Sequence, residues 1–348
     1  MVIIMQAGAP EAEIDAVLAA VKNAGFQPFV NPGVERKVIA LLGAMDAEKA
    51  ELADHFSALP GVERVTLISE PYKLASRRTH PDSSVVQIGS VAIGGPQVAV
   101  IAGPCSVESR DQMLDVAQLV KEYGANLLRG GAFKPRTSPY SFQGLGVAGL
   151  EILAEARRLT GLPIITEVLH TDDLDSIAEY ADAIQIGARN MQNFRLLQEV
   201  GRTGKPVILK RNPGCRIRDL LMASEYIMLE DNLNVILCER GITTFEDATR
   251  YTMDISAIPV IKRFSHLPVI ADPSHATGDW RYVTSIALAA IASGADGIMV
   301  EVHPDPSAAL SDGPQSLRPE KFADLMQAAA QVAAAVGRKL EIPGTPIG

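Results

Sequence analysis

The first 72 residues alternate short apolar runs with two longer amphipathic segments. The segments at 11–24 and 46–58 place apolar side chains at helical spacing. The apolar runs between them have the length and composition of strands, and read VIIMQA, FQPFV, KVIALLG and VERVTLI. Their order, β-α-β-β-α-β, predicts a small ferredoxin-like domain over residues 1–72 that has a possible regulatory role. Polar residues and Pro81 then interrupt the pattern, which indicates a linker over 73–85.

From residue 86 onward, apolar runs alternate with helix-like segments eight times. A short hairpin comes first and turns at Gly89–Ser90 or at Gly94–Gly95. The eight strands that follow are VAVIA, NLLR, PIITEV, AIQI, PVILK, NVILC, LPVIA and GIMVEV. Eight β-α units in about 250 residues are typical of a closed parallel barrel, so we predict a (β/α)8 TIM barrel over 86–345. No G-x-G-x-x-G follows the first strand, which argues against dinucleotide binding.

Composition narrows the classes of function. The 348 residues are 47% hydrophobic and 21% charged, as in a folded protein, and the net charge of −9 argues against a nucleic-acid partner. No apolar run reaches the roughly 18 residues of a membrane span, and the first residues lack the features of a signal peptide. The three cysteines are too few for a disulfide framework. We therefore expect a cytoplasmic protein without a membrane partner.

Chemically distinctive residues gather where three predicted strands end. Closure of a barrel makes its seventh, eighth and first strands neighbours, and active sites of such barrels lie at the carboxyl ends of the strands. The residues at these ends combine a thiol, imidazoles and carboxylates, which suits Zn, Fe, Co or Mn better than Mg or Ca. They are Cys105, His275, Glu301, His303, Asp305 and Asp312. The alternative is that Cys105 is simply a buried apolar side chain and His275 an ordinary loop histidine. This alternative explains each residue alone but not the whole set at three neighbouring strand ends.

A second set of strand-end residues is cationic. It comprises Arg129, Lys134, Arg136, Arg189, Lys210, Arg211 and Arg240. Charges that emerge from buried strands are costly unless they are paired or liganded, so a substrate with phosphate and carboxylate groups is the simplest explanation. Salt bridges to Glu167, Glu239 and Asp272 account for some of these cations but not for all of them. Glu167, at the end of the third strand, lies at a position suited to proton transfer.

These motifs together resemble the 3-deoxy-D-arabino-heptulosonate 7-phosphate (DAHP) synthase family, in the subtype with an N-terminal ferredoxin-like domain. The resemblance runs almost end to end. It rests on AGPCSVES, LLRGGAFKPRTSPYSFQGLG, TEVL, QIGARNMQNF, VILCERGITTFE, LPVIADPSHATG and GADGIMVEVHPDPSAALSDGPQSL. The resemblance implies a condensation of phosphoenolpyruvate with erythrose 4-phosphate and water. This is the first step of the shikimate pathway, which leads to the aromatic amino acids, and the resemblance suggests a homotetramer.

The resemblance also implies roles for individual residues. One divalent metal ion, Mn, Zn, Fe or Co, would be held by Cys105, His275, Glu301 and Asp312. The phosphate of phosphoenolpyruvate would be bound by Arg189, Lys210 and Arg240. Its carboxylate would face Arg129 and Lys134, and the phosphate of the aldose would be bound by Arg136 and Thr137. Proton transfer is expected of Lys134, Lys210 and Glu167.

Two other functions remain open at this stage. The related 3-deoxy-manno-octulosonate 8-phosphate synthases use arabinose 5-phosphate and usually have a KANRS-like segment, whereas residues 134–138 here read KPRTS and favour the four-carbon aldose. A metabolite-sensing protein without activity would be expected to have lost the metal ligands, which are present.

Two segments depart from the family pattern. Related sequences usually have KRG after the fifth strand, where this chain has KRNPGCRIRD, so closure of the pocket or thiol sensitivity could differ. Phe29 and Asn31 stand where feedback-regulated relatives tend to have His and Ser. The resemblance therefore supports the fold of the small domain better than an aromatic amino-acid ligand.

Overall fold

The computed structural model describes residues 1–31, 37–42, 49–66, 71–135 and 138–342. The chain divides into two compact units. Unit 1 consists of Met1–Ser83 with Arg263–His266, and unit 2 consists of Ser84–Lys262 with Leu267–Gly348. Within the described residues, no helix is long and apolar enough to cross a membrane.

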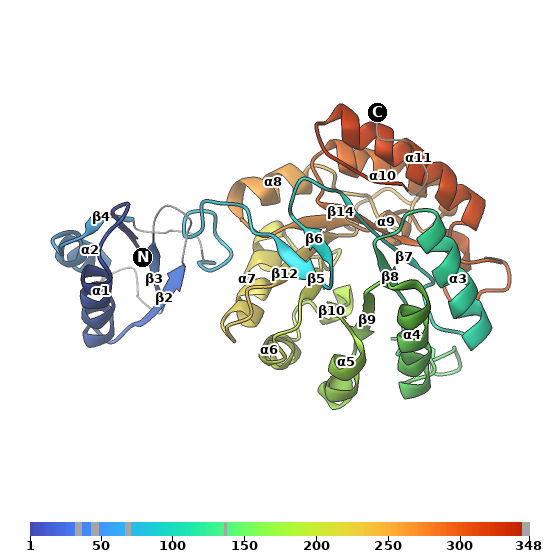
Figure 1. Ribbon diagram of the computed structural model, residues 1–348, viewed down its shortest axis with the longest axis horizontal. Coiled ribbons are helices and arrows are strands. Elements are labelled where there is room, and N and C mark those ends of the chain that lie inside the picture. The colour runs from blue at the N-terminus through green and yellow to red at the C-terminus, as the bar shows by residue number, and fades with distance from the viewer. Residues whose placement is uncertain (32–36, 43–48, 67–70, 136–137, 343–348) are drawn as a thin grey trace. The chain divides into compact units, whose positions relative to one another are not determined.

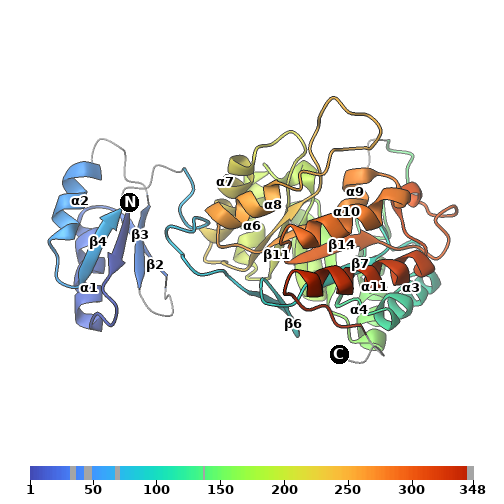
Figure 2. The same cartoon turned by 90° about the horizontal axis from the view of Figure 1, so that it is seen from above.

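Unit 1 contains a four-stranded antiparallel sheet in the order β2-β3-β1-β4. Its elements are β1 (Val2–Met5), α1 (Glu11–Asn23), β2 (Gln27–Asn31), β3 (Val38–Leu42), α2 (Lys49–Ser57) and β4 (Val62–Thr66). Both helices cover one face of the sheet (Figure 2). Alternate residues of β1, Ile3 and Met5, pack there against Ile14, Val17 and Val21 of α1. This confirms the ferredoxin-like fold predicted from the sequence.

Unit 2 contains a closed barrel of parallel strands in the order β10-β11-β12-β13-β14-β7-β8-β9. The strands are β7 (Ala99–Gly103), β8 (Leu127–Arg129), β9 (Ile164–Val168), β10 (Ala183–Ile186), β11 (Val207–Lys210), β12 (Val235–Glu239), β13 (Val269–Ala271) and β14 (Gly297–Glu301). Strand β14 closes the barrel on β7, and Glu301 lies opposite Gly103. The predicted (β/α)8 barrel is confirmed.

Helices surround these strands in the ribbon view (Figure 1). They are α3 (Arg110–Glu122), α4 (Val147–Thr160), α5 (Leu174–Tyr180), α6 (Phe194–Arg202), α7 (Ile217–Met228), α8 (Ala257–Phe264), α9 (Pro273–Thr277), α10 (Trp280–Ala292) and α11 (Pro319–Ala335). Three short 3-10 helices are η1 (Thr171–Asp173), η2 (Ala188–Asn190) and η3 (Gly313–Gln315).

A hairpin precedes the barrel and covers its amino end. Its strands are β5 (Val86–Ile88) and β6 (Val91–Ile93), so the turn lies at Gly89–Ser90 rather than at Gly94–Gly95. The apolar side chains of the hairpin join the cluster that fills the barrel interior. Gly89 lies close to Pro163, since a Cβ at Gly89 would be 2.8 Å from the Pro163 side chain. Pro163 directly precedes β9, so the hairpin lies at the amino end of the barrel. The carboxyl end carries the candidate site.

The segment VIADPSHATG shows how one strand end delivers a side chain. Strand β13 ends at Ala271, and the Asp272 carboxylate caps the next helical turn by accepting a hydrogen bond from the His275 amide. Pro273 occupies the first turn of α9, where a missing amide hydrogen costs nothing. Gly278 ends the turn at φ 69°, in the left-handed region. His275 is thus placed one turn beyond the strand.

Candidate active site at the carboxyl end of the barrel

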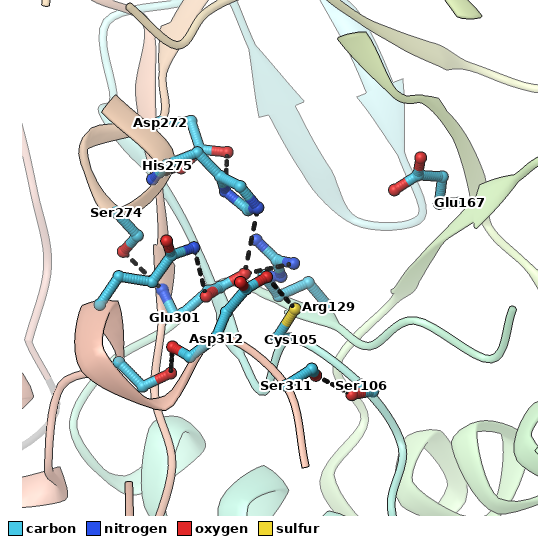
Figure 3. Close-up of polar contacts among 12 residues, drawn as sticks. Cys105, Ser106, Arg129, Glu167, Asp272, Ser274, His275, Glu301, Ser311 and Asp312 are labelled. Atoms are coloured by element: carbon cyan, nitrogen blue, oxygen red, sulfur yellow. Dashed lines mark hydrogen bonds and ion pairs between the residues drawn. The ribbon is translucent and has the colours of Figure 1, made fainter. Parts of the chain in front are cut away.

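A group of possible metal ligands lies where β14 meets β7 (Figure 3). The ligand atoms of Cys105, Glu301 and Asp312 all lie within 4.8 Å of one another. The Cys105 thiol donates a hydrogen bond to Asp312 Oδ2 over 3.0 Å. Closure of the barrel therefore brings together residues that are about 200 positions apart in the sequence.

His275 reaches the same group from α9. Its Nε2 lies 3.4 Å from Glu301 Oε1. Its Nδ1 lies 2.8 Å from Asp272 Oδ2. Asp272 also contacts Lys210 Nζ at 2.5 Å. Burial would raise the pKa of Asp272, but His275 and Lys210 hold that pKa well below its usual value.

The buried atoms of this group fit a bound cation. Glu301 Oε1 is buried without a hydrogen-bond partner among the described residues, although Arg129 Nη2 lies 3.1 Å away. Such an orphaned oxygen is costly unless a ligand satisfies it. One thiol, one imidazole and two carboxylates form a donor set that suits Zn, Mn, Fe or Co. Cys105, Glu301 and Asp312 can therefore hold one such ion; His275 is not in this set of mutually close ligand atoms but adjoins it through Glu301.

Four predicted cations, Lys134, Arg189, Lys210 and Arg240, line one cavity of about 460 Å³, which His275 and Asp312 also border. Lys134 contacts the carbonyl oxygen and the sulfur of Cys105, both at 3.0 Å. Arg189 donates to the Pro135 carbonyl, and Arg240 lies 5.0 Å from the centre of the Tyr251 ring. Among the residues that the structure describes, Lys134, Arg189 and Arg240 have no carboxylate partner. Their charge is available to an anion.

The salt-bridge alternative explains the other cations in part. Arg211 pairs with Glu239 at 2.7 Å and with Asp254 at 3.1 Å. It is therefore a structural residue rather than part of the anion pocket. Arg129 pairs with Glu301, yet its Nε and Nη1 are buried without a hydrogen-bond partner among the described residues. These two nitrogens can still bind an anionic group.

Glu167 projects from β9 into the same cavity and stands apart from the metal-ligand group in the close-up (Figure 3). Its Oε2 accepts a hydrogen bond from Gln185 Nε2 over 2.9 Å. Its Oε1 lies over Gly187, where a Cβ would be only 1.9 Å away. The glycine of the QIGARN motif is thus needed to leave room for this carboxylate.

Two of the predicted strand-end residues, His303 and Asp305, lie outside the metal-ligand group. Arg136 and Thr137 fall outside the described residues. His303 contacts Glu108 at 3.4 Å, and Asp305 accepts hydrogen bonds from Ser307. Neither belongs to the metal-ligand group found in the described part of the chain.

The unusual loop after β11 forms part of the cavity wall. Asn212, Pro213 and Gly214 line the cavity, and the Pro213 carbonyl accepts a hydrogen bond from the Thr243 amide. Cys215 is half-buried just beyond them. The departure from the family pattern therefore lies at the pocket itself.

Three residues of the site were not anticipated from the sequence. Arg250 and Tyr251 line the cavity, and Gln315 hydrogen-bonds to Glu301. None of them ends a strand, so the strand-end pattern gave no signal for them. The only available signal was their presence in loops that connect barrel strands to helices.

A (β/α)8 barrel whose cationic cavity adjoins a thiol, imidazole and carboxylate group defines a class of barrel enzymes that act on anionic substrates with a metal ion. The DAHP synthetase I family matches residues 76–337, and the DAHP synthase ferredoxin-like domain matches residues 1–70. The chain belongs to the DAHP synthetase I family, as its motifs predict.

Individual relatives agree with this assignment. The chain is 48% identical to phospho-2-dehydro-3-deoxyheptonate aldolase of Thermotoga maritima, over 98% of this chain and 100% of the relative. The crystal structure of that Thermotoga DAHP synthase superposes with a TM-score of 0.78, covering 98% of this chain and 99% of the other. A 2-dehydro-3-deoxyphosphooctonate aldolase of Syntrophobacter fumaroxidans is 34% identical over 68% of this chain and 87% of the relative. The likeness thus favours the heptulosonate enzymes.

Proposed function

We propose that the protein condenses phosphoenolpyruvate with erythrose 4-phosphate and water to give DAHP and inorganic phosphate. This is the first step of the shikimate pathway. The observation that carries the proposal is the cavity in which Lys134, Arg189 and Arg240 have no carboxylate partner in the described part of the chain, and which opens onto the metal-ligand group. Two anionic substrates need such cations to offset their mutual repulsion.

Phosphoenolpyruvate occupies the cationic cavity in this proposal. Arg189, Lys210 and Arg240 bind its phosphate. Arg129 and Lys134 face its carboxylate, which would satisfy the buried Nε and Nη1 of Arg129. The phosphate of the aldose is assigned to Arg136 and Thr137.

One divalent ion, Mn, Zn, Fe or Co, is assigned to Cys105, His275, Glu301 and Asp312. When bound, it supplies a Lewis acid that polarises the aldehyde of the four-carbon sugar. Lys134 and Asp272 support the ligands from outside, since they contact Cys105 and His275 respectively.

Proton transfer is assigned to Lys134, Lys210 and Glu167. The methylene carbon of phosphoenolpyruvate forms a bond to the aldehyde carbon, and the aldehyde oxygen gains a proton. Water then adds to C2 of the former phosphoenolpyruvate and loses a proton, for which Glu167 is the acceptor in the cavity wall. Collapse of this adduct breaks the bond between C2 and the phosphate oxygen, the C2 hydroxyl becomes the ketone of DAHP, and its proton leaves with the released phosphate.

The test is loss of phosphoenolpyruvate with either erythrose 4-phosphate or arabinose 5-phosphate. The protein is first stripped with a chelator and then given back Mn, Zn or Co. We expect metal-dependent turnover with the four-carbon sugar alone. Turnover with the five-carbon sugar would assign the protein to the octulosonate enzymes, and inactivity with both would favour a metabolite-sensing protein.

We also propose a cytoplasmic homotetramer, with no nucleic-acid or membrane partner. Resemblance to the family and the net charge of −9 support this. Sedimentation at micromolar concentration should give a single species of four chains, and a monomer would contradict the assembly.

A further inference from the structure

Gln315 lies on η3, three residues after Asp312, and only 2% of its surface is exposed. Its side-chain amide connects two charged groups. Nε2 donates a hydrogen bond to Glu301 Oε2 over 2.8 Å, and Oε1 accepts one from Arg250 Nη1 over 3.1 Å. The amide therefore lies between a candidate metal ligand and a cation that lines the substrate cavity.

Chemistry fixes which way this amide points. A guanidinium group only donates hydrogen bonds, so the amide oxygen of Gln315 must face Arg250. The amide nitrogen then faces Glu301 and engages Oε2. The other carboxylate oxygen, Oε1, is left as the buried atom without a hydrogen-bond partner in the described part of the chain, 3.4 Å from His275 Nε2. Oε1, which also lies 3.1 Å from Arg129 Nη2, is the carboxylate oxygen without a hydrogen bond among the described residues and can bind a metal ion.

Arg250 is itself tied to the other ligands. Its backbone amide donates to the Thr277 carbonyl, and that of Tyr251 donates to the Ala276 carbonyl, so the segment is attached to the helix that carries His275. Its Nη1 also lies 3.9 Å from Asp312 Oδ1. The guanidinium is thus held in a fixed place relative to the metal-ligand group.

We propose that Gln315 is a positioning residue for the metal ion, and that Arg250 acts through it. Gln315 holds the Glu301 carboxylate with Oε1 toward the ion, and Arg250 prevents the amide from turning over. The inference rests on the metal site of the proposed function. Loss of an outer contact to a metal ligand typically weakens metal affinity by about 10–100-fold.

If only the charge of Arg250 mattered, its removal would have the opposite effect on metal affinity. Removing a positive charge near a cation site should strengthen cation binding. If Arg250 acts by orienting Gln315, its removal should weaken binding instead. The sign of the change therefore separates positioning from charge.

The experiment measures Co²⁺ affinity of chelator-stripped protein by competition with a chelator, together with the thiolate-to-cobalt absorption band. The variants are Gln315→Met, Arg250→Met and their combination. We expect Gln315→Met and Arg250→Met each to bind Co²⁺ about 10–100-fold more weakly with an altered cobalt spectrum. The double variant should bind no more weakly than Gln315→Met alone, because both residues act in one contact. Gln198→Met is the matched control, since Gln198 donates to Glu230 on the outside of the barrel.

Unchanged affinity and spectrum in Gln315→Met would overturn the inference, as would tighter binding in Arg250→Met or additive losses in the double variant. If Gln315→Met fails to fold, Arg250→Met decides alone, because 40% of that side chain is exposed. Absence of Co²⁺ binding by the unaltered protein would instead refute the metal site and the inference with it. Metal binding is measured apart from turnover, so a failure of the proposed reaction is seen separately.

Discussion

At the scale of single residues, Cys105 is held by two contacts. Its sulfur lies 3.0 Å from Asp312 Oδ2 and 3.0 Å from Lys134 Nζ. Burial, followed by the charge of Glu301, raises the pKa of the thiol to about 12, while Lys134 opposes this shift. A thiol with such a pKa stays protonated at neutral pH unless a metal ion binds to it. The surroundings therefore suit a metal ligand better than a free nucleophile.

Replacing this sulfur should remove metal binding and turnover together. We expect Cys105→Ser to weaken Co²⁺ affinity by more than about 100-fold, because loss of an outer contact alone costs roughly 10–100-fold. Chelator competition measures affinity, and consumption of phosphoenolpyruvate measures turnover. Cys215→Ser, in a half-buried loop position, is the control and should retain both. Full metal affinity in Cys105→Ser would show that the sulfur is not a ligand.

Gly187 tests the role of Glu167 without altering the carboxylate itself. A Cβ at this position would lie 1.9 Å from Glu167 Oε1, so Gly187→Ala must displace that side chain. Misplacement of a reacting group by about 1 Å can cost 100-fold in rate. We expect kcat to fall by about that factor, with metal affinity unchanged.

The control for this substitution is Gly95→Ala, because a Cβ there meets no atom within 4 Å. Its kcat should equal that of the unaltered protein. Normal kcat in Gly187→Ala would mean that the position of Glu167 does not matter to the reaction.

At the scale of elements, strands β11 and β12 are joined by a buried ion pair. Arg211 directly follows β11 and contacts Glu239, the last residue of β12, and Asp254 in the segment before α8. Burial raises the pKa of Glu239 even though Arg211 lowers it, so the carboxylate depends on this partner. The pair therefore secures the carboxyl end of the barrel.

Removing Arg211 should leave a buried, unpaired charge. We expect Arg211→Met to lower the free energy of unfolding by about 3–5 kcal/mol. Adding Glu239→Gln should recover part of this loss. Urea unfolding followed by fluorescence of Trp280, the single tryptophan, reports on unit 2. Arg202→Met is the control, because the Arg202 side chain is 49% exposed and surface ion pairs contribute less than about 1 kcal/mol. An equal loss of unfolding free energy in both variants would show that burial of the Arg211 pair does not matter.

The sequence could predict the elements and the strand ends because both depend on local pattern. Apolar runs stop at Gly103, Ala271 and Val300, and chemically active residues such as Cys105, Asp272 and Glu301 follow them. Which charged residues form ion pairs with each other could not be predicted in the same way. Lys210 and Arg211 are adjacent, yet one contacts Asp272 and the other Glu239, a choice made by the three-dimensional alternation of the strand.

The loop residues of the site could not be predicted from the sequence for a different reason. Arg250 and Gln315 are brought to the site by backbone hydrogen bonds and by the 3-10 helix η3, neither of which leaves a periodic pattern. Their partners also lie far away in the sequence, as the contact between Arg250 and Gln315 illustrates. Residues that support a site from irregular segments need the folded structure to be recognised.

At the scale of the whole molecule, unit 1 includes a segment that is remote in sequence. Arg263–His266 clusters with Met1–Ser83. The Arg77 amide donates to the Phe264 carbonyl, and Ser76 forms an antiparallel bridge with Ser265. The His266 ring hydrogen-bonds to the Leu74 carbonyl over 2.7 Å and stacks on His80. Residues 71–83 thus bury His266, even though they precede the first strand of the barrel.

This burial makes stability depend on pH in a definite direction. Burial lowers the pKa of His266 to about 4, and the hydrogen bond to Leu74 only partly opposes this. The unfolded chain, with a histidine pKa near 6.5, therefore binds the proton more readily than the folded chain does. The contribution of neutral, buried His266 to the free energy of unfolding is complete above pH 6.5 and is lost as the pH falls toward 4. Its magnitude is about 3 kcal/mol.

Two shortened chains test this account. A chain of residues 71–348 keeps the partners of His266, whereas one of residues 84–348 lacks them. We expect the longer chain to be more stable at pH 7. Between pH 7 and pH 4, its free energy of unfolding should fall by about 3 kcal/mol more than that of the shorter chain. His266→Asn in the longer chain is the matched control, because it removes the titrating ring and should abolish that excess. Urea unfolding at each pH, followed by Trp280 fluorescence, provides the measurement; equal pH dependence in the two shortened chains would show that residues 71–83 do not bury His266.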